Sequence, residues 1–380
     1  MARADGEGSV YRRSRDGKWV AAVSVRDPGT GERRRVTAVR RTQREAREAM
    51  RALQGRVESG APMRDSRVTL EAWTKHWAAT VLPASGRRAT TVDTYRTLVR
   101  SCVLPHLGGV ALADLRPSDV EGWLVTLDEA GRWSASTRRQ SLTVLRAVLD
   151  GAVRDGLMAT NPASDVTRPK VARTEAAHYS PAQVATVLQA AEGHRLAPLW
   201  RVMVTTGLRR GEALALGWQH VDLEARELRV RGTLVRTGGH LVVQPPKTAN
   251  GWRTIPLSTS AAEALRAQRR QQATERLAAG PSWIDTGHVF TTEAGTPLDP
   301  RNVSRAFETL ARQADVGGSL HTLRHTALTA MAVAGVPLSV VSRTAGHESI
   351  TTTVDLYGHV SEEASRDAVE LLSAHLGLSG

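Results

Sequence analysis

A rare tyrosine near the end of the chain stands close to a histidine. Tyr357 is one of only four tyrosines in 380 residues, and it follows His347 by ten positions in the segment AGHESITTTVDLYGHV (345–360). A phenol has a pKa near ~10, so it is a poor nucleophile until neighbouring positive charge or a base favours loss of its proton. Considered alone, a tyrosine here is better explained by packing, and a nucleophilic role requires partners elsewhere in the chain.

An arginine and a glutamate form the first set of candidate partners. The segment TTGLRRGEALAL (205–216) places Arg209 and Glu212 three residues apart on a predicted helix, so that the two side chains share one face. Gly207 allows the chain to turn into that helix. A surface ion pair would contribute little to stability, and this simpler explanation stays open for the motif by itself.

A lysine in the segment PKTANGWRTIPL (246–257) is the second candidate. Lysine and arginine together number 51, and only four of them are lysines, of which Lys247 is the last. Arginine is effectively never deprotonated, whereas lysine gives up a proton when its pKa is depressed. A position that retains lysine in an arginine-rich chain is therefore a candidate proton donor, with chance retention as the alternative. We expect Lys247 at a strand end, entering a hairpin around Gly251.

Two histidines and an arginine form the third group. In HTLRHTALTAMAVAG (321–335), His321, Arg324 and His325 fall at i, i+3 and i+4, on one face at the start of a predicted helix. His321 and His325 also have the spacing of zinc ligands, but the glutamate of H-E-x-x-H is missing and no cysteine and histidine cluster would complete a site. We therefore expect no metal, and we interpret His325 as structural or as a support for the residues that carry the chemistry.

Together and in this order, the motifs resemble the tyrosine recombinase (phage integrase) family. That family combines an arginine in T-G-L-R-x-x-E, a lysine in a hairpin, H-x-L-R-H, G-H, and a tyrosine at the spacing found between His347 and Tyr357. The resemblance in order and spacing covers residues 205–357, and a three-part layout extends it more loosely to nearly the whole chain. Any one of these motifs alone would be a weak signal.

The resemblance implies a phosphate-binding role for two arginines. Arg209 and Arg324 match the arginines that hold the scissile phosphate, and Glu212 matches the acidic residue that braces the first of them. Guanidinium groups suit this role because they are planar, bidentate and permanently charged, as the spreading charge of a phosphoryl transition state requires.

The remaining matched residues imply the nucleophile and its proton transfers. Tyr357 matches the nucleophile, and Lys247 matches the hairpin lysine, which would protonate the leaving 5′-oxygen. His321 matches the first histidine of H-x-L-R-H and would accept the phenolic proton, while His347 fills a position that is His or Trp in relatives. The sequence departs from the family at Ala345, where leucine is commoner before G-H, and this concerns helix packing more than chemistry.

These roles imply a site-specific DNA recombinase, an integrase of a phage or mobile element, that cuts and rejoins strands through a 3′-phosphotyrosine intermediate. The intermediate keeps the bond energy, so no metal, ATP or other cofactor is implied, and no G-x-x-x-x-G-K-[ST] phosphate loop occurs. A type IB topoisomerase and a chromosome-dimer resolvase are alternatives with similar chemistry. A non-catalytic DNA-binding regulator is a more distant alternative, disfavoured by the full set of reactive residue types.

The charge of the chain indicates a polyanionic partner. The 51 basic residues exceed the 38 acidic ones by 13, which favours nucleic acid over a membrane surface. The resemblance implies double-stranded DNA attachment sites, a homotetramer on two duplexes, an excisionase or directionality factor, and a host DNA-bending protein.

Other features bear on location in the cell. No segment approaches the roughly 18 consecutive apolar residues of a membrane span, and the N-terminus has no apolar signal core. The single cysteine, Cys102, continues an apolar stripe at helical spacing and is expected in a core, which fits a reducing cytoplasm. The enzyme would associate with the nucleoid when bound to DNA.

The predicted fold class is multidomain α+β, and it begins with a small three-stranded sheet plus a helix in residues 1–60. This segment alternates in β fashion around turns at Asp16-Gly17 and at Pro28–Gly31, and Thr42 with Glu45 forms a capping box for the helix. Its 15 basic against 8 acidic residues favour an arm-type DNA-binding domain.

Two larger domains follow. Residues 68–165 show helical periodicity and predict an all-helical core-binding domain of about four helices. Residues 178–380 predict a tyrosine recombinase catalytic domain, mixed but mainly helical, that opens with a Ser180–Gln183 capping box. Its small antiparallel sheet is expected from strands at 227–235, 240–244, 252–257 and 288–292, with a turn at Gly238-Gly239.

Overall fold

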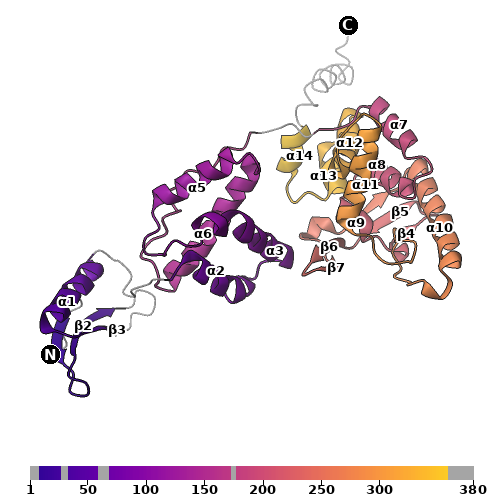
Figure 1. The fold of residues 1–380 in the computed structure, drawn as a ribbon. Helices are drawn as coiled ribbons and strands as arrows, with labels where there is room; N and C mark the ends of the chain where they lie inside the picture. The colour runs from indigo at the N-terminus through magenta and orange to yellow at the C-terminus, as the bar shows by residue number, and fades with distance from the viewer. Residues whose placement is uncertain (1–7, 27–32, 59–67, 173–176, 358–380) are drawn as a thin grey trace, which may run out of the picture. The chain divides into compact units, whose positions relative to one another are not determined.

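The computed structural model describes residues 8–26, 33–58, 68–172 and 177–357. The chain divides into two compact units, Met1–Ala172 and Arg173–Gly380 (Figure 1). None of the helices within these described ranges is long and apolar enough to cross a membrane.

The first unit begins with the predicted three-stranded antiparallel sheet. Strands β1 (Gly8–Arg12), β2 (Trp19–Arg26) and β3 (Arg33–Arg40) follow one another in space as in sequence, and helix α1 (Gln43–Glu58) packs on them (Figure 1). The predicted capping box of α1 is present, since the backbone N–H of Glu45 donates to Thr42 Oγ1 at 3.2 Å and that of Thr42 to Glu45 Oε2 at 3.3 Å.

The rest of the first unit is helical, as predicted. Its helices are α2 (Leu70–Ala79), α3 (Ala89–Leu98), α4 (Leu104–Leu107), α5 (Pro117–Glu129) and α6 (Ala135–Arg154), with a π-helical turn at Val99–Val103 joining α3 to α4 and a 3₁₀ turn at Pro83–Ser85. Cys102 is fully buried, as expected, and its carbonyl accepts a hydrogen bond of 2.8 Å from Trp123 Nε1. Trp73 Nε1 donates likewise to the carbonyl of Val148. These paired indoles tie α2 and α5 to their neighbours without leaving buried donors unsatisfied.

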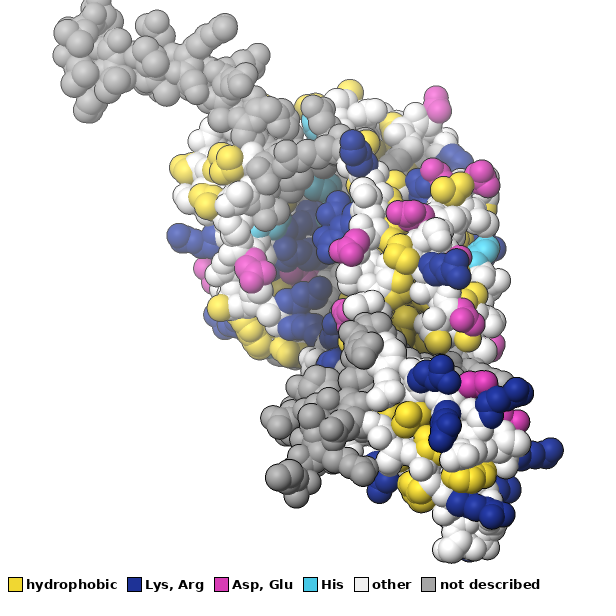
Figure 2. Space-filling view, turned by 90° about the vertical axis from the view of Figure 1, so that its left-hand side faces the viewer, with side chains coloured by type: hydrophobic (Ala, Val, Ile, Leu, Met, Phe, Trp, Pro, Cys, Tyr) yellow, Lys and Arg dark blue, Asp and Glu magenta, His cyan; other side chains and the backbone are white. Residues whose placement is uncertain are grey.

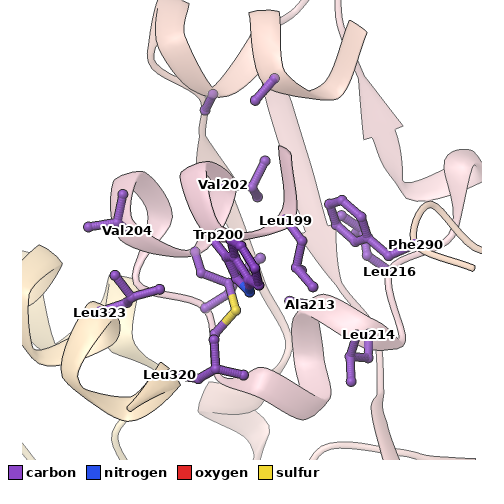
Figure 3. Close-up of a cluster of buried hydrophobic side chains, with 14 of the residues drawn as sticks. Leu199, Trp200, Val202, Val204, Ala213, Leu214, Leu216, Phe290, Leu320 and Leu323 are labelled. Carbon is purple, nitrogen blue, oxygen red and sulfur yellow. The ribbon is translucent and has the colours of Figure 1, made fainter. Parts of the chain in front are cut away.

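The second unit is a helical body that carries two small sheets. Its helices are α7 (Pro181–Ala190), α8 (Ala197–Thr206), α9 (Arg210–Leu214), α10 (Thr259–Ala279), α11 (Pro300–Gln313), α12 (Leu320–Val333), α13 (Leu338–Ala345) and α14 (Ile350–Tyr357), with 3₁₀ turns at Trp218–His220, Ala249–Gly251 and Gly280–Ser282. The predicted capping box opens α7, with Ser180 and Gln183 bonded to each other's backbone. Helix α8 lies at the centre of the core, where Trp200 meets Phe307 edge-on at 5.6 Å and packs among leucine and valine side chains (Figure 3).

The strands of this unit partly differ from the prediction. The predicted strand 227–235 is two strands in different sheets, β5 (Glu227–Val230) and β6 (Thr233–Thr237). Strand β6 forms the predicted hairpin with β7 (His240–Gln244) through Gly238-Gly239. Strand β8 (Arg253–Pro256) pairs with β5, which also pairs with β4 (Val221–Asp222), so the expected hairpin around Gly251 is wrong: β7 and β8 lie in separate sheets.

The predicted strand at 288–292 is also wrong, and side chains of α10 explain why. Val289 and Phe290 are buried, but the backbone forms only isolated bridges at His288 and Thr291. Gln268 Nε2 donates to the carbonyl of Val289, and Gln272 Nε2 to that of His288, at 3.1 and 3.0 Å. Side-chain amides thus take the place of a neighbouring strand, because an apolar run specifies burial but not a ladder partner.

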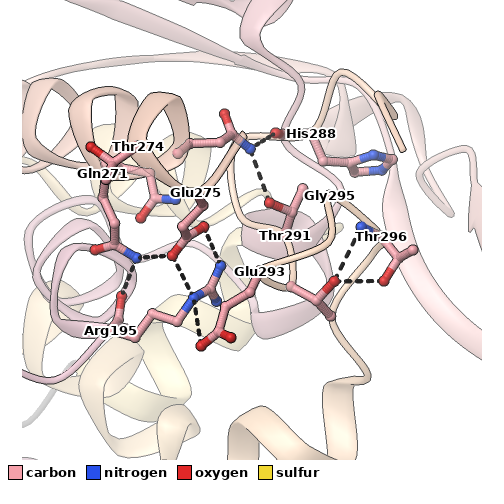
Figure 4. A network of polar contacts seen from close by, with 12 residues as sticks. Arg195, Gln271, Thr274, Glu275, His288, Thr291, Glu293, Gly295 and Thr296 are labelled. Atoms are coloured by element: carbon pink, nitrogen blue, oxygen red, sulfur yellow. Dashed lines mark hydrogen bonds and ion pairs between the residues drawn. The ribbon is translucent and has the colours of Figure 1, made fainter. Parts of the chain in front are cut away.

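A polar network joins α10 to the segment before α8 (Figure 4). Arg195 forms a bidentate ion pair with Glu275 of α10, with both N···O distances 2.7 Å, and Gln271 donates to the same carboxylate at 2.9 Å. Glu293 lies 4.0 Å from the Arg195 guanidinium. The network is half-buried and its ion pair is bidentate, so it holds α10 more firmly than a single exposed ion pair would.

Candidate active site

A carboxylate at the start of α9 organises the predicted residues. Gly207, at φ +66°, ends α8 in the left-handed conformation, and Arg209 occupies the N-cap of α9 with Glu212 three residues on. Arg209 Nη1 donates to Glu212 Oε1 at 2.8 Å, and the Arg209 backbone N–H donates to Oε2 at 2.9 Å. The predicted contact between the two side chains is therefore present. Glu212 is buried, whereas the Arg209 side chain is 40% exposed and accessible to a ligand.

A second arginine, absent from the sequence prediction, shares the same carboxylate. Arg253 of β8 is buried and donates from Nη2 to Glu212 Oε2 at 2.8 Å and from Nη1 to Oε1 at 3.1 Å. Burial by itself raises the pKa of Glu212, but the hydrogen bonds and charge of Arg253, with the charge of Arg209, outweigh it and hold that pKa below its ordinary value. Arg253 lies in the same sequence segment as Lys247. No local sequence feature distinguishes it from the 46 other arginines, so the sequence did not predict its role.

Removing Arg253 is expected to destabilise the second unit. Arg253→Met would leave the buried Glu212 charge with Arg209 alone, and breaking a buried pair by deleting one partner costs about 3 kcal/mol or more. Urea denaturation measures the free energy of unfolding. Arg312→Met, at an exposed position on α11, is the matched control and should change it by no more than about 0.5 kcal/mol. Equal stability of the two variants would contradict a structural role for the Arg253–Glu212 pair.

Arg324 of α12 is the most buried of the predicted site residues. Its side chain is 2% exposed, and its forked guanidinium spans two segments that are far apart in sequence. Nη1 donates to the carbonyl of Gly207 at 2.7 Å, and Nη2 donates to that of Ala345 at 2.8 Å and to His347 Nε2 at 3.1 Å. Arg324 therefore joins the α8–α9 turn to the end of α13.

Four consecutive carbonyls at the end of α13 each accept a hydrogen bond from a different side chain. The acceptors are residues 344–347, and the donors, in the same order, are Arg253, Arg324, Arg209 and Asn250, at 2.7, 2.8, 2.9 and 3.1 Å. The C-terminus of a helix carries partial negative charge on such carbonyls, so cationic donors suit it. The two predicted phosphate-binding arginines thus meet at adjacent peptide groups.

A glycine makes this close approach feasible. Gly346 ends α13 at φ +63°, a conformation that favours glycine. A Cβ placed there would come within 2.8 Å of Arg253 Nη1 and 3.1 Å of the Asn250 carbonyl oxygen. The G-H dipeptide of the sequence motif is therefore required by packing around the buried arginine as well as by the backbone turn.

His347 is held at both ring nitrogens. Nε2 faces Arg324 Nη2 at 3.1 Å, and Nδ1 lies 2.8 Å from Thr353 Oγ1 of α14. Burial, aided by the charges of Arg324 and Arg209, lowers the pKa of His347 to about 4. The imidazole is consequently neutral at physiological pH, between the arginine cluster and the helix that ends at Tyr357.

The two histidines of α12 lie beside this cluster. The His321 and His325 rings meet edge-on, with centroids 4.4 Å apart. His321 is at the surface with one side covered, and partial burial, followed by the charges of Arg324 and Arg209, lowers its pKa. Neutral His321 is therefore suited to accept a proton. Within the described residues, no group of histidine, cysteine or acidic side chains could hold a metal ion.

Two partly buried histidines are expected to make stability depend on pH. Burial is the main cause that lowers the pKa of both His325 and His347 from 6.5 to about 4. Between these pH values the unfolded chain binds more protons than the folded one, so their contribution is complete above pH 6.5 and is lost as the pH falls toward 4. Denaturation at a series of pH values should show a shallower decline for the double variant His325→Gln/His347→Gln. Identical slopes would refute this origin.

The remaining predicted residues lie at the margins of the cluster. Lys247 is exposed in the loop between β7 and β8, and the described hydrogen-bonded cluster does not include it. Tyr357 is the last residue of α14, and its side chain lies outside the described residues. Helix α14 begins only three residues after His347, so Tyr357 belongs to an element anchored directly on the cluster.

A hollow opens next to these groups. It has a volume of about 480 Å³ and is lined by the 249–253 segment, by α13 and by His347 with Glu348 and Ile350. In Figure 2, Lys and Arg side chains gather on the face in view, with His side chains near them. Such a concentration of fixed positive charge favours an anionic ligand, and two adjacent guanidinium forks are suited to a phosphodiester.

Comparison with known proteins identifies a family for this chain. Residues 179–364 match the model of the phage integrase family, and residues 75–156 match that of the phage integrase N-terminal SAM-like domain. The chain is 30% identical to a tyrosine recombinase XerC-like protein of Caldanaerobacter subterraneus subsp. tengcongensis, over 80% of this chain and 83% of that protein. It is also 30% identical to an integrase of Streptomyces ambofaciens, over 93% and 92% of the two chains.

Solved structures show the same fold. The Tn1549 transposon integrase in complex with transposon right-end DNA has a TM-score of 0.65 at 23% identity, covering 80% of this chain and 100% of that one. A lambda integrase dimer bound to a COC′ core site has a TM-score of 0.61 at 18% identity and covers 94% and 96% of the two chains. The second of these likenesses extends to nearly the full length of the present chain.

Proposed function

Since this chain belongs to the phage integrase family of tyrosine recombinases, we propose that it integrates a phage or mobile element by cutting and rejoining DNA at specific attachment sites. One observation carries the proposal. Arg209, at the start of α9, and Arg324, on α12, donate to adjacent carbonyls of the same short segment, and Arg324 also donates to the neutral imidazole of His347. Two converging guanidinium forks beside a neutral ring form a receptor for one phosphodiester.

Arg209 and Arg324 would bind the non-bridging oxygens of the scissile phosphate. Arg209 is braced by Glu212, which is itself held by Arg253, so its guanidinium is positioned before DNA binds. Pre-positioned donors lower the barrier because they need no reorganisation as negative charge spreads in the transition state. His347 adds a third group at the same place.

Tyr357 would attack the phosphorus. Its phenolic oxygen forms a bond to phosphorus as the bond to the 5′-oxygen breaks, which leaves a 3′-phosphotyrosine and a free 5′-hydroxyl. The phenolic proton passes to His321, and Lys247 supplies a proton to the departing 5′-oxygen. Attack by the 5′-hydroxyl of another strand reverses these steps and seals the new junction. This scheme balances without metal, ATP or cofactor.

The partners follow from this chemistry. We propose double-stranded attachment sites as substrate, with a homotetramer joining two duplexes, an arrangement supported by the structure of a lambda integrase tetramer on a Holliday junction. Residues 1–60 would bind arm-type sites, 68–165 core sites, and 178–380 would carry out catalysis. An excisionase or directionality factor and a host DNA-bending protein are the expected accessory proteins, and the enzyme would act in the cytoplasm on nucleoid DNA.

A nicked-substrate assay tests this function. The substrate is a duplex that carries the attachment site found in the DNA flanking the gene, nicked near the cleavage position so that the released fragment diffuses away. In EDTA, the protein is expected to become covalently linked to the 3′ side of the break, and two intact sites should yield recombinant products. Failure to form the adduct would reject the proposed chemistry, and relaxation of supercoiled DNA without recombination would favour a type IB topoisomerase.

The role of Lys247 gives a separate prediction. Lys247→Arg keeps the charge but removes a usable proton, so the cleavage rate should fall about 10²-fold or more, the usual contribution of a general acid. A 5′-thio leaving group departs without protonation and should restore the rate. Single-turnover cleavage of the two substrates measures both effects, and undiminished cleavage of the ordinary 5′-oxygen substrate would rule out Lys247 as the acid.

A further inference from the structure

A buried threonine connects the tyrosine-bearing helix to the cluster. Thr353 of α14 is fully buried, and its Oγ1 lies 2.8 Å from His347 Nδ1. It precedes Tyr357 by four residues, so the two positions lie on one face of α14. The sequence suggests only packing for this residue. Its hydroxyl, however, forms the hydrogen bond that joins α14 to the His347 imidazole.

The partner at the other ring nitrogen determines which proton this bond uses. A guanidinium has five N–H donors and no acceptor, so Arg324 can only donate to His347 Nε2. Nε2 therefore presents a lone pair, the ring proton of the neutral imidazole is on Nδ1, and Nδ1–H donates to Thr353 Oγ1. In the free enzyme, His347 is thus in the tautomer that is protonated at Nδ1 and cannot donate from Nε2 to a phosphate.

A hydroxyl at position 353 is compatible with the opposite tautomer as well. When a phosphate occupies the arginine cluster, an Nε2–H would be needed to donate to one of its oxygens, and Nδ1 would then require a donor. A threonine hydroxyl is one donor and two acceptor lone pairs on a rotatable bond, so it can reverse its role without moving its oxygen. Valine has the same shape as threonine and can do neither.

We propose that Thr353 is a positioning residue that orients His347 and permits its change of tautomer when phosphate binds. This rests on the proposed function for the role of His347 as a phosphate ligand. The bond also sets the rotation of α14, because it holds the face of that helix which carries position 357 against the cluster. Histidines that bind metal ions commonly depend in the same way on a hydrogen-bond partner at the second ring nitrogen.

Isosteric variants separate this role from packing. Thr353→Val keeps the volume and removes the hydroxyl, and Thr353→Ser keeps the hydroxyl and removes a methyl group. Thr74→Val is the matched control, because the Thr74 hydroxyl is buried in the first unit and has no hydrogen-bond partner. Two measurements are made on the full chain: the ¹⁵N shifts of the His347 ring, identified through His347→Gln, and the single-turnover rate of adduct formation on the nicked substrate.

The wild type, Thr353→Ser and Thr74→Val are expected to show His347 protonated at Nδ1. Thr353→Val should shift these ring signals and slow adduct formation about tenfold, the effect of one lost hydrogen bond. Thr353→Ser should restore most of the rate. In a His347→Ala background, Thr353→Val should cause no further loss, because its effect passes through the imidazole.

The contrary results are equally distinct. Wild-type ring signals and rate in Thr353→Val, or an undiminished effect of Thr353→Val in the His347→Ala background, would overturn the proposal. If the wild type forms no adduct at all, the proposed function fails, and the ring signals then decide the role of Thr353: unchanged signals in Thr353→Val reject it, and shifted signals restored by Thr353→Ser support it.

Discussion

Replacing Tyr357 with phenylalanine is expected to eliminate covalent attachment to DNA, with a fall in cleavage rate of about 10⁶-fold, as when other covalent enzymes lose their nucleophile. The substitution removes one oxygen atom. It leaves in place the hydrogen bonds among Arg209, Arg324 and the carbonyls of residues 345–346, because none of these bonds involves position 357. The phosphate receptor should therefore persist while the reaction is lost.

Binding serves as the control for this variant. Tyr357→Phe should bind the attachment site with an affinity within a few fold of wild type in a gel-shift assay, since phosphate contacts supply most of the affinity of such proteins. Rapid cleavage by Tyr357→Phe would show that another group attacks the phosphorus. Loss of both binding and cleavage would instead indicate damage to the fold.

Arg324→Lys is the second variant with a large expected effect, a loss of cleavage of about 10³-fold. The guanidinium holds two backbone carbonyls and the His347 ring at once, through nitrogens fixed in one plane. A lysine ammonium keeps the charge but has one nitrogen, so it cannot span the α8–α9 turn and the end of α13 while also facing a phosphate. Removal of a single preorganised donor elsewhere already costs about 10²–10³ in rate.

Arg312→Lys provides the matched control for this change. Arg312 is exposed on α11, and conversion to lysine there should leave the cleavage rate unchanged. Single-turnover rates for the two variants, measured at saturating protein, separate the chemical step from binding. A rate for Arg324→Lys close to that of Arg312→Lys would exclude Arg324 from transition-state stabilisation.

Local signals predicted much of the fold. The capping boxes at Thr42 and Ser180 lie where the sequence placed them, since such boxes depend on residues three positions apart. The hairpin turn at Gly238-Gly239 is likewise local. The predictions of a strand at 288–292 and of a hairpin around Gly251 were wrong because tertiary packing decides which strands pair. A side chain of α10 bonds the backbone of 288–292, and β8 pairs with β5 instead of β7.

The contacts of the candidate site also divide into those that local sequence spacing predicts and those that depend on tertiary packing. Arg209 and Glu212 meet because they are three residues apart on one helical turn, and their contact was predictable. Arg253 was not, because its partners Glu212 and Thr344 are 41 and 91 residues away. The hydrogen bond between Thr353 and His347 spans only six residues. Which ring nitrogen of His347 carries the proton in this bond, however, depends on Arg324 of α12, which is distant in sequence.

Identifying the residue that carries the DNA tests the central claim most directly. The adduct formed on the nicked attachment site in EDTA would be digested with protease and nuclease, and the linked peptide analysed by mass spectrometry. We predict a nucleotide joined through a 3′-phosphate to the phenolic oxygen of Tyr357. Attachment at Tyr179, whose hydroxyl is engaged with the Gly317 carbonyl at 2.6 Å, or at any other residue, would contradict this account.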